Sequence, residues 1–254
     1  MGLLLSASIS PKPSLPIQWA NVCNMDSDGD GMTNGQELGD PQCIWTPGAT
    51  PTRTAGLTHP GVQKRILRFP LTAIPDNETT YRCMTFDLDE SQDYHMIATK
   101  PEIDNFHITH HMLLYGCHDG APVIARPEDC GLFSPVCPDI IAFWGVGIPG
   151  QCLYKETGFR IGKTGYKRVL LELHWNNPKK ISGQMDASGF SIFYTPNLRP
   201  YDAGVLTTGE TNLVIPPGRS RTVFESVCTS RCTKKILRDT IYLIEGYDHM
   251  HSKE

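Results

Sequence analysis

Residues 168–175, RVLLELHW, carry the alternation that sets the fold class. Every second side chain from Leu171 to Trp175 is apolar and falls on one face of an extended strand, whereas Glu172 and His174 fall on the other. Similar short runs, rich in β-branched and aromatic residues and bounded by Gly, Pro, Asn or Asp, recur from residue 65 onward. The pattern predicts an all-β, antiparallel sandwich from about residue 65.

The composition is that of a globular chain without a polyanionic partner. Hydrophobic residues make up 39% of the 254 residues and charged residues 20%, and the formal net charge is −4. A negative net charge argues against nucleic acid as a partner. No apolar run approaches the length of a membrane span, so none is expected.

The cysteines indicate an oxidising compartment. There are nine of them and no CxxC pair, which disfavours a zinc ribbon and favours a disulfide framework. Asn77 begins an N-glycosylation sequon, Asn-Glu-Thr. The first ten residues, MGLLLSASIS, lack a basic region and make a poor signal peptide. We therefore expect a protein of the secretory-pathway lumen or a secreted protein, with an incomplete N-terminus.

Two segments precede the predicted sandwich, an N-terminal stretch and a compact module. Residues 1–16 are polar and Pro-rich and are expected to be disordered. Residues 17–57 form a compact unit that Cys23 and Cys43 bracket. Within it, residues 26–37, DSDGDGMTNGQE, fit the twelve-residue calcium loop at every diagnostic position. The predicted ligands are the side chains of Asp26, Asp28, Asp30, Asn34 and Glu37 and the backbone carbonyl of Met32. The alternative is an acidic, Gly-rich turn that binds no metal.

Residues 19–54, WANVCNMDSDGDGMTNGQELGDPQCIWTPGATPTRT, resemble temptin, a family of small secreted proteins of molluscan pheromone signalling. The resemblance implies a Cys23–Cys43 disulfide and an extracellular module that calcium stabilises.

Histidines form a second set of candidate metal ligands. His110 and His111 lie in HITHHMLLYGC (107–117), His174 lies on the strand described above, and His249 and His251 lie near the C-terminus. Imidazoles on strands suit copper or zinc, and residues i and i+2 of a strand share a face. Adjacent His110 and His111 normally point to opposite faces, so a shared metal requires a twisted or bulged strand there.

The motifs HHMLLYGC, LELHWNNP, IPPG, VCTSRCT and HMH, in this order, resemble the copper type II ascorbate-dependent monooxygenases. That family includes dopamine β-monooxygenase, to which the likeness is closer, and peptidylglycine α-hydroxylating monooxygenase. The resemblance implies two jelly-roll-like domains with one copper each, here residues 65–198 and an incomplete second domain, residues 199–254. It assigns the first copper to His110, His111 and His174. The second copper falls to His249 and His251 with a methionine that we expect beyond the end of this chain.

The same resemblance implies further residues. Tyr81 and His249 are the expected catalytic residues. Disulfides are implied between Cys83 and Cys130 and between Cys117 and Cys137. Cys152, Cys228 and Cys232 remain without partners, which favours a truncated chain.

The function that follows is a secreted monooxygenase. It would hydroxylate an activated C–H bond of a small amine or peptide with O2, copper and ascorbate, and the present chain, being incomplete, is expected to be inactive. A non-catalytic secreted protein that binds calcium and copper is the alternative, and a structural zinc protein built on the same histidines is another. The oligomeric state and the substrate lie beyond these motifs.

Overall fold

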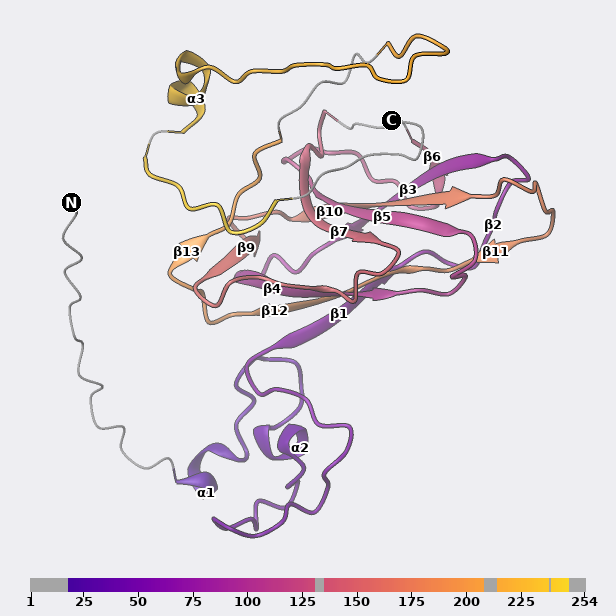
Figure 1. The fold of residues 1–254 in the computed structure, drawn as a ribbon. Coiled ribbons are helices and arrows are strands. Elements are labelled where there is room, and N and C mark those ends of the chain that lie inside the picture. The colour runs from indigo at the N-terminus through magenta and orange to yellow at the C-terminus, as the bar shows by residue number, and fades with distance from the viewer. Residues whose placement is uncertain (1–17, 131–134, 208–213, 238, 247–254) are drawn as a thin grey trace.

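The computed structural model describes residues 18–130, 135–207, 214–237 and 239–246. Two β-sheets dominate it (Figure 1). The first contains β1 (Gln63–Arg68), β12 (Gly189–Thr195), β4 (Asp93–Glu102), β9 (Thr157–Gly162) and β13 (Tyr201–Asp202) in this order, with β8 (Gln151–Cys152) paired to β4. The second contains β6 (Glu128–Asp129), β3 (Thr79–Asp87), β10 (Arg168–Asn176), β5 (Thr109–Gly116) and β7 (Asp139–Gly145) in this order. A small third sheet pairs β2 (Thr72–Ala73) with β11 (Met185–Asp186). The prediction of an all-β sandwich is confirmed.

The core lies between the two large sheets. Leu171, Leu173 and Trp175 of β10 are all 0% exposed and pack in one cluster with Met112 of β5 and Phe190 of β12. The alternation in β10 therefore has the direct physical cause that the sequence suggested, which is burial of one face against the opposing sheet.

The outer face of the second sheet is also covered. A second apolar cluster contains Leu113 and Tyr115 of β5, Leu170 of β10 and the disulfide sulfur atoms of Cys83 and Cys117. Disulfides Cys83–Cys130 and Cys117–Cys137 fasten the segment after β5 over this cluster. Strands β5 and β10 are consequently buried on both faces, which holds them more rigidly than edge strands.

The N-terminal module contains two short helices, α1 (Trp19–Val22) and α2 (Asn34–Leu38), and the Cys23–Cys43 disulfide links the C-cap of α1 to the loop after α2. A capping box of Thr33 and Gln36 starts α2. Strand β1 leads from this module into the first sheet (Figure 1). The buried side-chain amide of Gln63, the first residue of β1, donates to the backbone carbonyl of Asp28, so the module is tied to the sandwich.

The segment after residue 200 differs from the prediction. Tyr201 and Asp202 pair in parallel with β9 and so belong to the first sheet. The strand-like runs of the sequence continue here, at 203–209, 212–218, 221–228 and 240–251, and parts of them lie outside the described residues. The described parts of residues 203–246 contain no strand, and helix α3 (Ser230–Ile236) lies apart from both sheets (Figure 1). The reason is that an extended run becomes a strand only when another strand accepts its hydrogen bonds, and Val223 and Leu243 remain exposed here.

No helix among the described residues has the length and apolarity needed to cross a membrane.

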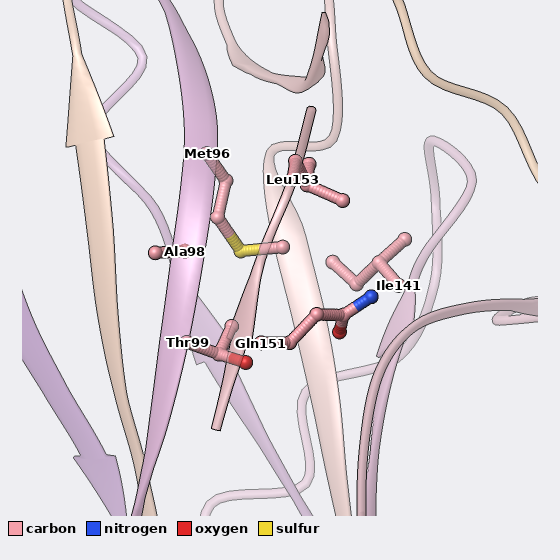
Figure 2. A pocket seen from close by; sticks show the side chains of 6 residues that line it. All are labelled: Met96, Ala98, Thr99, Ile141, Gln151 and Leu153. Atoms are coloured by element: carbon pink, nitrogen blue, oxygen red, sulfur yellow. The ribbon is translucent and has the colours of Figure 1, made fainter. Parts of the chain in front are cut away.

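A narrow, mostly apolar pocket lies beside β8 (Figure 2). It includes no predicted site residue. Its lining consists of Met96, Ala98, Thr99, Ile141, Gln151 and Leu153.

Candidate metal centre

The three histidines predicted for the first copper lie together on the two central strands of the second sheet. In the pairing of β5 with β10, His174 lies opposite His111, and the next residue, Trp175, lies opposite Thr109. His110 is therefore an extra residue in β5, and the register shift at this point is a β-bulge. The bulge turns His110 to the side of the sheet that His111 already faces, which is the distortion that a shared metal requires.

The ring nitrogens of the three histidines converge. Nδ1 of His111 lies 3.2 Å from Nδ1 of His110 and 3.3 Å from Nδ1 of His174. A ring nitrogen has one lone pair or one hydrogen in the ring plane, so hydrogen bonding alone cannot satisfy both contacts of the His111 Nδ1. Two ligand atoms of a tetrahedral ion with bonds of about 2.0 Å are about 3.3 Å apart. The observed spacing fits three imidazoles around one metal ion.

Imidazole is a ligand type that suits copper and zinc, so the donor set agrees with the copper interpretation without excluding zinc. His111 and His174 are buried, at 4% and 3% exposed, and His110 is the most exposed of the three. The cluster thus has two ligands set in the sheet and one that faces outward.

Aromatic rings border the cluster. The Tyr81 ring on β3 stacks on the His174 ring, with centroids 4.2 Å apart and planes at 11°, and its centroid is 6.2 Å from that of His111. The Phe143 ring on β7 lies 6.4 Å from the His111 ring. Tyr81, predicted to be catalytic, therefore contacts a candidate ligand of the first copper, whereas the sequence patterns did not single out Phe143.

A buried carboxyl group lies two residues before His174 on the same face of β10. Glu172 is 2% exposed, and burial raises the pKa of its carboxyl to about 7, which the hydrogen bond from the Tyr115 hydroxyl opposes. In turn, burial first and then the Glu172 charge raise the pKa of the Tyr115 hydroxyl. The alternation placed Glu172 on the histidine side, but nothing in the sequence indicated that this side is buried.

The calcium loop forms a second cluster of candidate ligands. Carboxylate oxygens of Asp26, Asp28 and Asp30 lie within 4.8 Å of one another. Glu37 is 0% exposed and Asp28 is 2% exposed, and Asp28 Oδ2 and both Glu37 oxygens have no donor in regular hydrogen-bond geometry among the described residues. Burial raises the pKa of both carboxyl groups, and neighbouring aspartates add to this, but the Thr58 side chain lowers the pKa of Glu37. The backbone amide of Gly31 lowers the pKa of Asp26.

Buried carboxylates that lack donors need a cation or a proton. The loop therefore fits a hard cation such as Ca²⁺, which takes many oxygen ligands. The remaining predicted ligands lie in the same loop. Asn34 is 6% exposed with its Oδ1 lacking a partner, and Met32 directly precedes the N-cap of α2.

The other predicted site residues fall in three groups. The structure forms the three disulfides that the resemblances imply, and Cys152, Cys228 and Cys232 are free and exposed. Asn77 is exposed in the turn before β3, where a glycan has room. His249 and His251 lie outside the described residues, so the second copper site has no structural description.

Three family models match the chain. The N-terminal domain of the copper type II ascorbate-dependent monooxygenases matches residues 66–182, and the C-terminal domain of the same family matches residues 201–253. The temptin C-terminal model matches residues 14–62. The matches keep the order of the three segments distinguished in the sequence.

Curated relatives point the same way. Dopamine beta-hydroxylase of Equus caballus is 31% identical over 199 residues, which is 73% of this chain and 33% of that protein. Tyramine beta-hydroxylase of Caenorhabditis briggsae is 33% identical over 70% of this chain and 32% of that protein. DBH-like monooxygenase protein 1 of Gallus gallus is 34% identical over 65% of this chain and 29% of that protein. The chain spans about a third of the length of these relatives. It belongs to the copper type II ascorbate-dependent monooxygenases, a family of enzymes.

Proposed function

We propose that His110, His111 and His174 bind one copper ion through their Nδ1 atoms and that this centre transfers electrons within a monooxygenase. The observation that carries the proposal is that the Nδ1 atom of His111 lies 3.2 Å from the His110 Nδ1 and 3.3 Å from the His174 Nδ1. A bound copper ion supplies one-electron redox chemistry.

The protein's own contribution at this centre is rigidity. His111 and His174 are held on central strands that are buried on both faces, and the Tyr81 ring stacks against His174 and restricts its rotation. A ligand set that cannot rearrange lowers the cost of changing the oxidation state, because little has to move when an electron arrives or leaves. Tyr81 supports the site by contact with a ligand, and a catalytic role for it remains part of the proposal.

The chemistry beyond electron transfer concerns residues outside the described structure. We infer that His249 and His251 contribute to a second copper site, where O2 is used to hydroxylate an activated C–H bond and ascorbate is the reductant. Two of the relatives are named for aromatic amines, which favours a small amine over a peptide as substrate. Three disulfides and the exposed Asn77 sequon support residence in the secretory pathway.

The N-terminal module adds a calcium site to this proposal. Asp26, Asp28, Asp30, Asn34 and Glu37, with the Met32 carbonyl, would surround one Ca²⁺ ion. The two Glu37 oxygens, buried with no donor in regular hydrogen-bond geometry, support this assignment because a cation would compensate their charge.

The test of the copper site compares two histidine variants. Residues 1–254 would be expressed, loaded with Cu(II) without reductant and analysed for metal content and for the Cu(II) electron paramagnetic resonance (EPR) spectrum. His174→Ala should remove one copper per chain, because two neighbouring ligands on one strand do not enclose an ion. His118→Ala is the matched control. His118 follows β5, the strand that carries His110 and His111, but its side chain is 62% exposed and lies apart from the cluster. Equal copper content in the parent and His174→Ala would refute the assignment, and a parent that binds zinc but no copper would favour a structural zinc site.

A further inference from the structure

The candidate copper site depends on a one-residue bulge, and a bulge persists only if the strands are held in register on both sides of it. On one side the register is fixed by the core. Met112 lies opposite Leu173 and Leu114 lies opposite Leu171, and all four side chains are 0% exposed. A slip of β5 on this side would turn these side chains out of the core.

On the other side the strands end, so the register there depends on few backbone pairs, although Trp175 and Ile108 still pack in the core. The last pair of the ladder is Trp175 with Thr109, followed by a hydrogen bond from the Asn176 amide to the Ile108 carbonyl, 2.9 Å. The amides of Ile108 and Thr109 both donate to the carbonyl of Asn105, at 3.3 and 3.1 Å. The position of Asn105 therefore determines where β5 begins relative to β10.

One buried carboxylate joins the two strands at this point. Asp186 of β11 is 0% exposed. Its Oδ2 accepts a hydrogen bond from Trp175 Nε1 at 2.8 Å, and its Oδ1 accepts one from the Asn105 backbone amide at 3.1 Å. Oδ1 also accepts from the Ser188 hydroxyl at 2.6 Å and the Ser188 amide at 3.2 Å. Asp186 thus connects the residue after His174 with the turn that precedes His110.

We propose that Asp186 is a positioning residue that holds the His110 bulge and so keeps His110 and His111 on one face of the sheet. The inference rests on the proposed copper site for its consequence but on these contacts for its geometry. A carboxylate suits the role because it only accepts hydrogen bonds, and four donors converge on it. An amide of the same shape presents one oxygen and two N–H groups, so one donor would face another donor.

The test uses Asp186→Asn in a background that also carries His249→Ala and His251→Ala, so that the three-histidine cluster alone reports. Copper affinity would be measured by competition with a Cu(I) chelator, and the ligand set would be monitored by the EPR spectrum of the Cu(II) form. We expect copper binding to weaken by about 10- to 100-fold, as for other residues that support metal ligands, and the Cu(II) hyperfine splitting to change.

The control is Ile192→Ala, which removes a 1% exposed core side chain from the opposite sheet. It should lower the thermal stability without altering the EPR spectrum of the copper site. An unchanged copper affinity and spectrum in Asp186→Asn, despite a stability loss like that of Ile192→Ala, would overturn the positioning role. If Asp186→Asn does not fold, Trp175→Phe removes a single donor and should show the same changes in smaller measure, and an unaltered site there would overturn the role.

The geometry can be judged without metal. In a crystal structure of metal-free Asp186→Asn, the proposal predicts that Trp175 no longer pairs with Thr109 and that His110 is displaced from the cluster. A retained bulge contradicts the inference whatever the copper result. Failure of the proposed function would look different, because the background chain itself would then bind no copper at the cluster.

Discussion

Replacing Glu37 by Gln should change the stability of the N-terminal module in opposite directions with and without calcium. Glu37 is 0% exposed, and neither of its carboxylate oxygens has a donor in regular hydrogen-bond geometry among the described residues, although the Thr58 side chain partly offsets the effect of burial. Without calcium, the buried charge and its repulsion from Asp28 and Asp30 destabilise the module, and the neutral amide removes both effects. With calcium, the carboxylate becomes the bidentate ligand that the amide cannot replace.

The magnitudes follow from the number of unpaired groups and from mass action. Relieving the buried carboxylate should stabilise the calcium-free module by about 1 kcal/mol, at the lower end of the range for an unsatisfied buried group. Calcium at about 100 times the dissociation constant stabilises the parent by about 2.7 kcal/mol, but only by about 0.4 kcal/mol if the variant binds about a hundredfold more weakly. The Glu37→Gln variant should therefore be about 1 kcal/mol more stable than the parent in EDTA and about 1 kcal/mol less stable in calcium.

Hydrogen exchange measures this locally. The amides of α2 report the opening free energy of the module even if the sandwich unfolds in the same transition. Glu128→Gln is the matched control, because it makes the same chemical change at an exposed residue of β6 and should have little effect in either buffer. The reasoning fails if the difference between Glu37→Gln and the parent has the same sign in calcium and in EDTA.

Three further predictions concern single groups. Burial raises the pKa of Glu37, so the folded calcium-free module binds a proton more readily than the unfolded chain; its stability should fall as the pH rises through the pKa of the folded state, and Glu37→Gln should flatten this dependence in a denaturation series. Tyr81→Phe should preserve copper binding whereas Tyr81→Ala should weaken it, because the stacked ring on His174 is worth about 0.5–1.5 kcal/mol; chelator competition distinguishes the two, and equal affinities would contradict a stacking role. Replacing both Cys83 and Cys130 by Ser should lower the free energy of unfolding in urea by up to about 4 kcal/mol, since that disulfide closes a loop over 47 positions; a loss below about 1 kcal/mol would mean that the unfolded chain is already compact there.

The sequence predicted the features of this fold that local alternation determines. In β10, the fully buried Leu171 and Leu173 face the core, and His174 faces the other side, as the period of two requires. Features that depend on contacts between distant segments left no local pattern. The His95 ring is 0% exposed, with Nε2 2.7 Å from Asp202 Oδ1 and Nδ1 accepting from the Arg199 amide at 2.9 Å, over separations of 107 and 104 residues. An isolated histidine in a sequence gives no indication of such partners.

In the candidate site, too, local sequence patterns predicted some residues, whereas others depend on contacts between distant segments. Histidine spacing and family resemblance placed His110, His111 and His174 together, and the geometry of a strand already implied a distortion between adjacent ligands. No sequence pattern predicted the residues that hold the distortion, because Asp186 and Asn105 are 81 positions apart and neither belongs to a periodic pattern. Phe143 reaches the cluster from β7 in a similar way, and its place beside His111 follows from sheet order alone.

The order of the strands in the second sheet explains how ligands can be brought together here with little distortion of the backbone. Tyr81, His174, His111 and Gly145 lie opposite one another on β3, β10, β5 and β7, so a single row across the sheet supplies two candidate ligands and the ring that stacks on one of them. A row of this kind holds ligands by backbone hydrogen bonds on both sides, but it alone provides neighbours about 5 Å apart rather than three donors around a point. The bulge supplies the third donor, because it moves His110 into the space beside the row without breaking the pairing of the core residues that follow. The candidate copper site is therefore expected to be sensitive to any change that restores regular pairing between β5 and β10, even where that change improves the sheet.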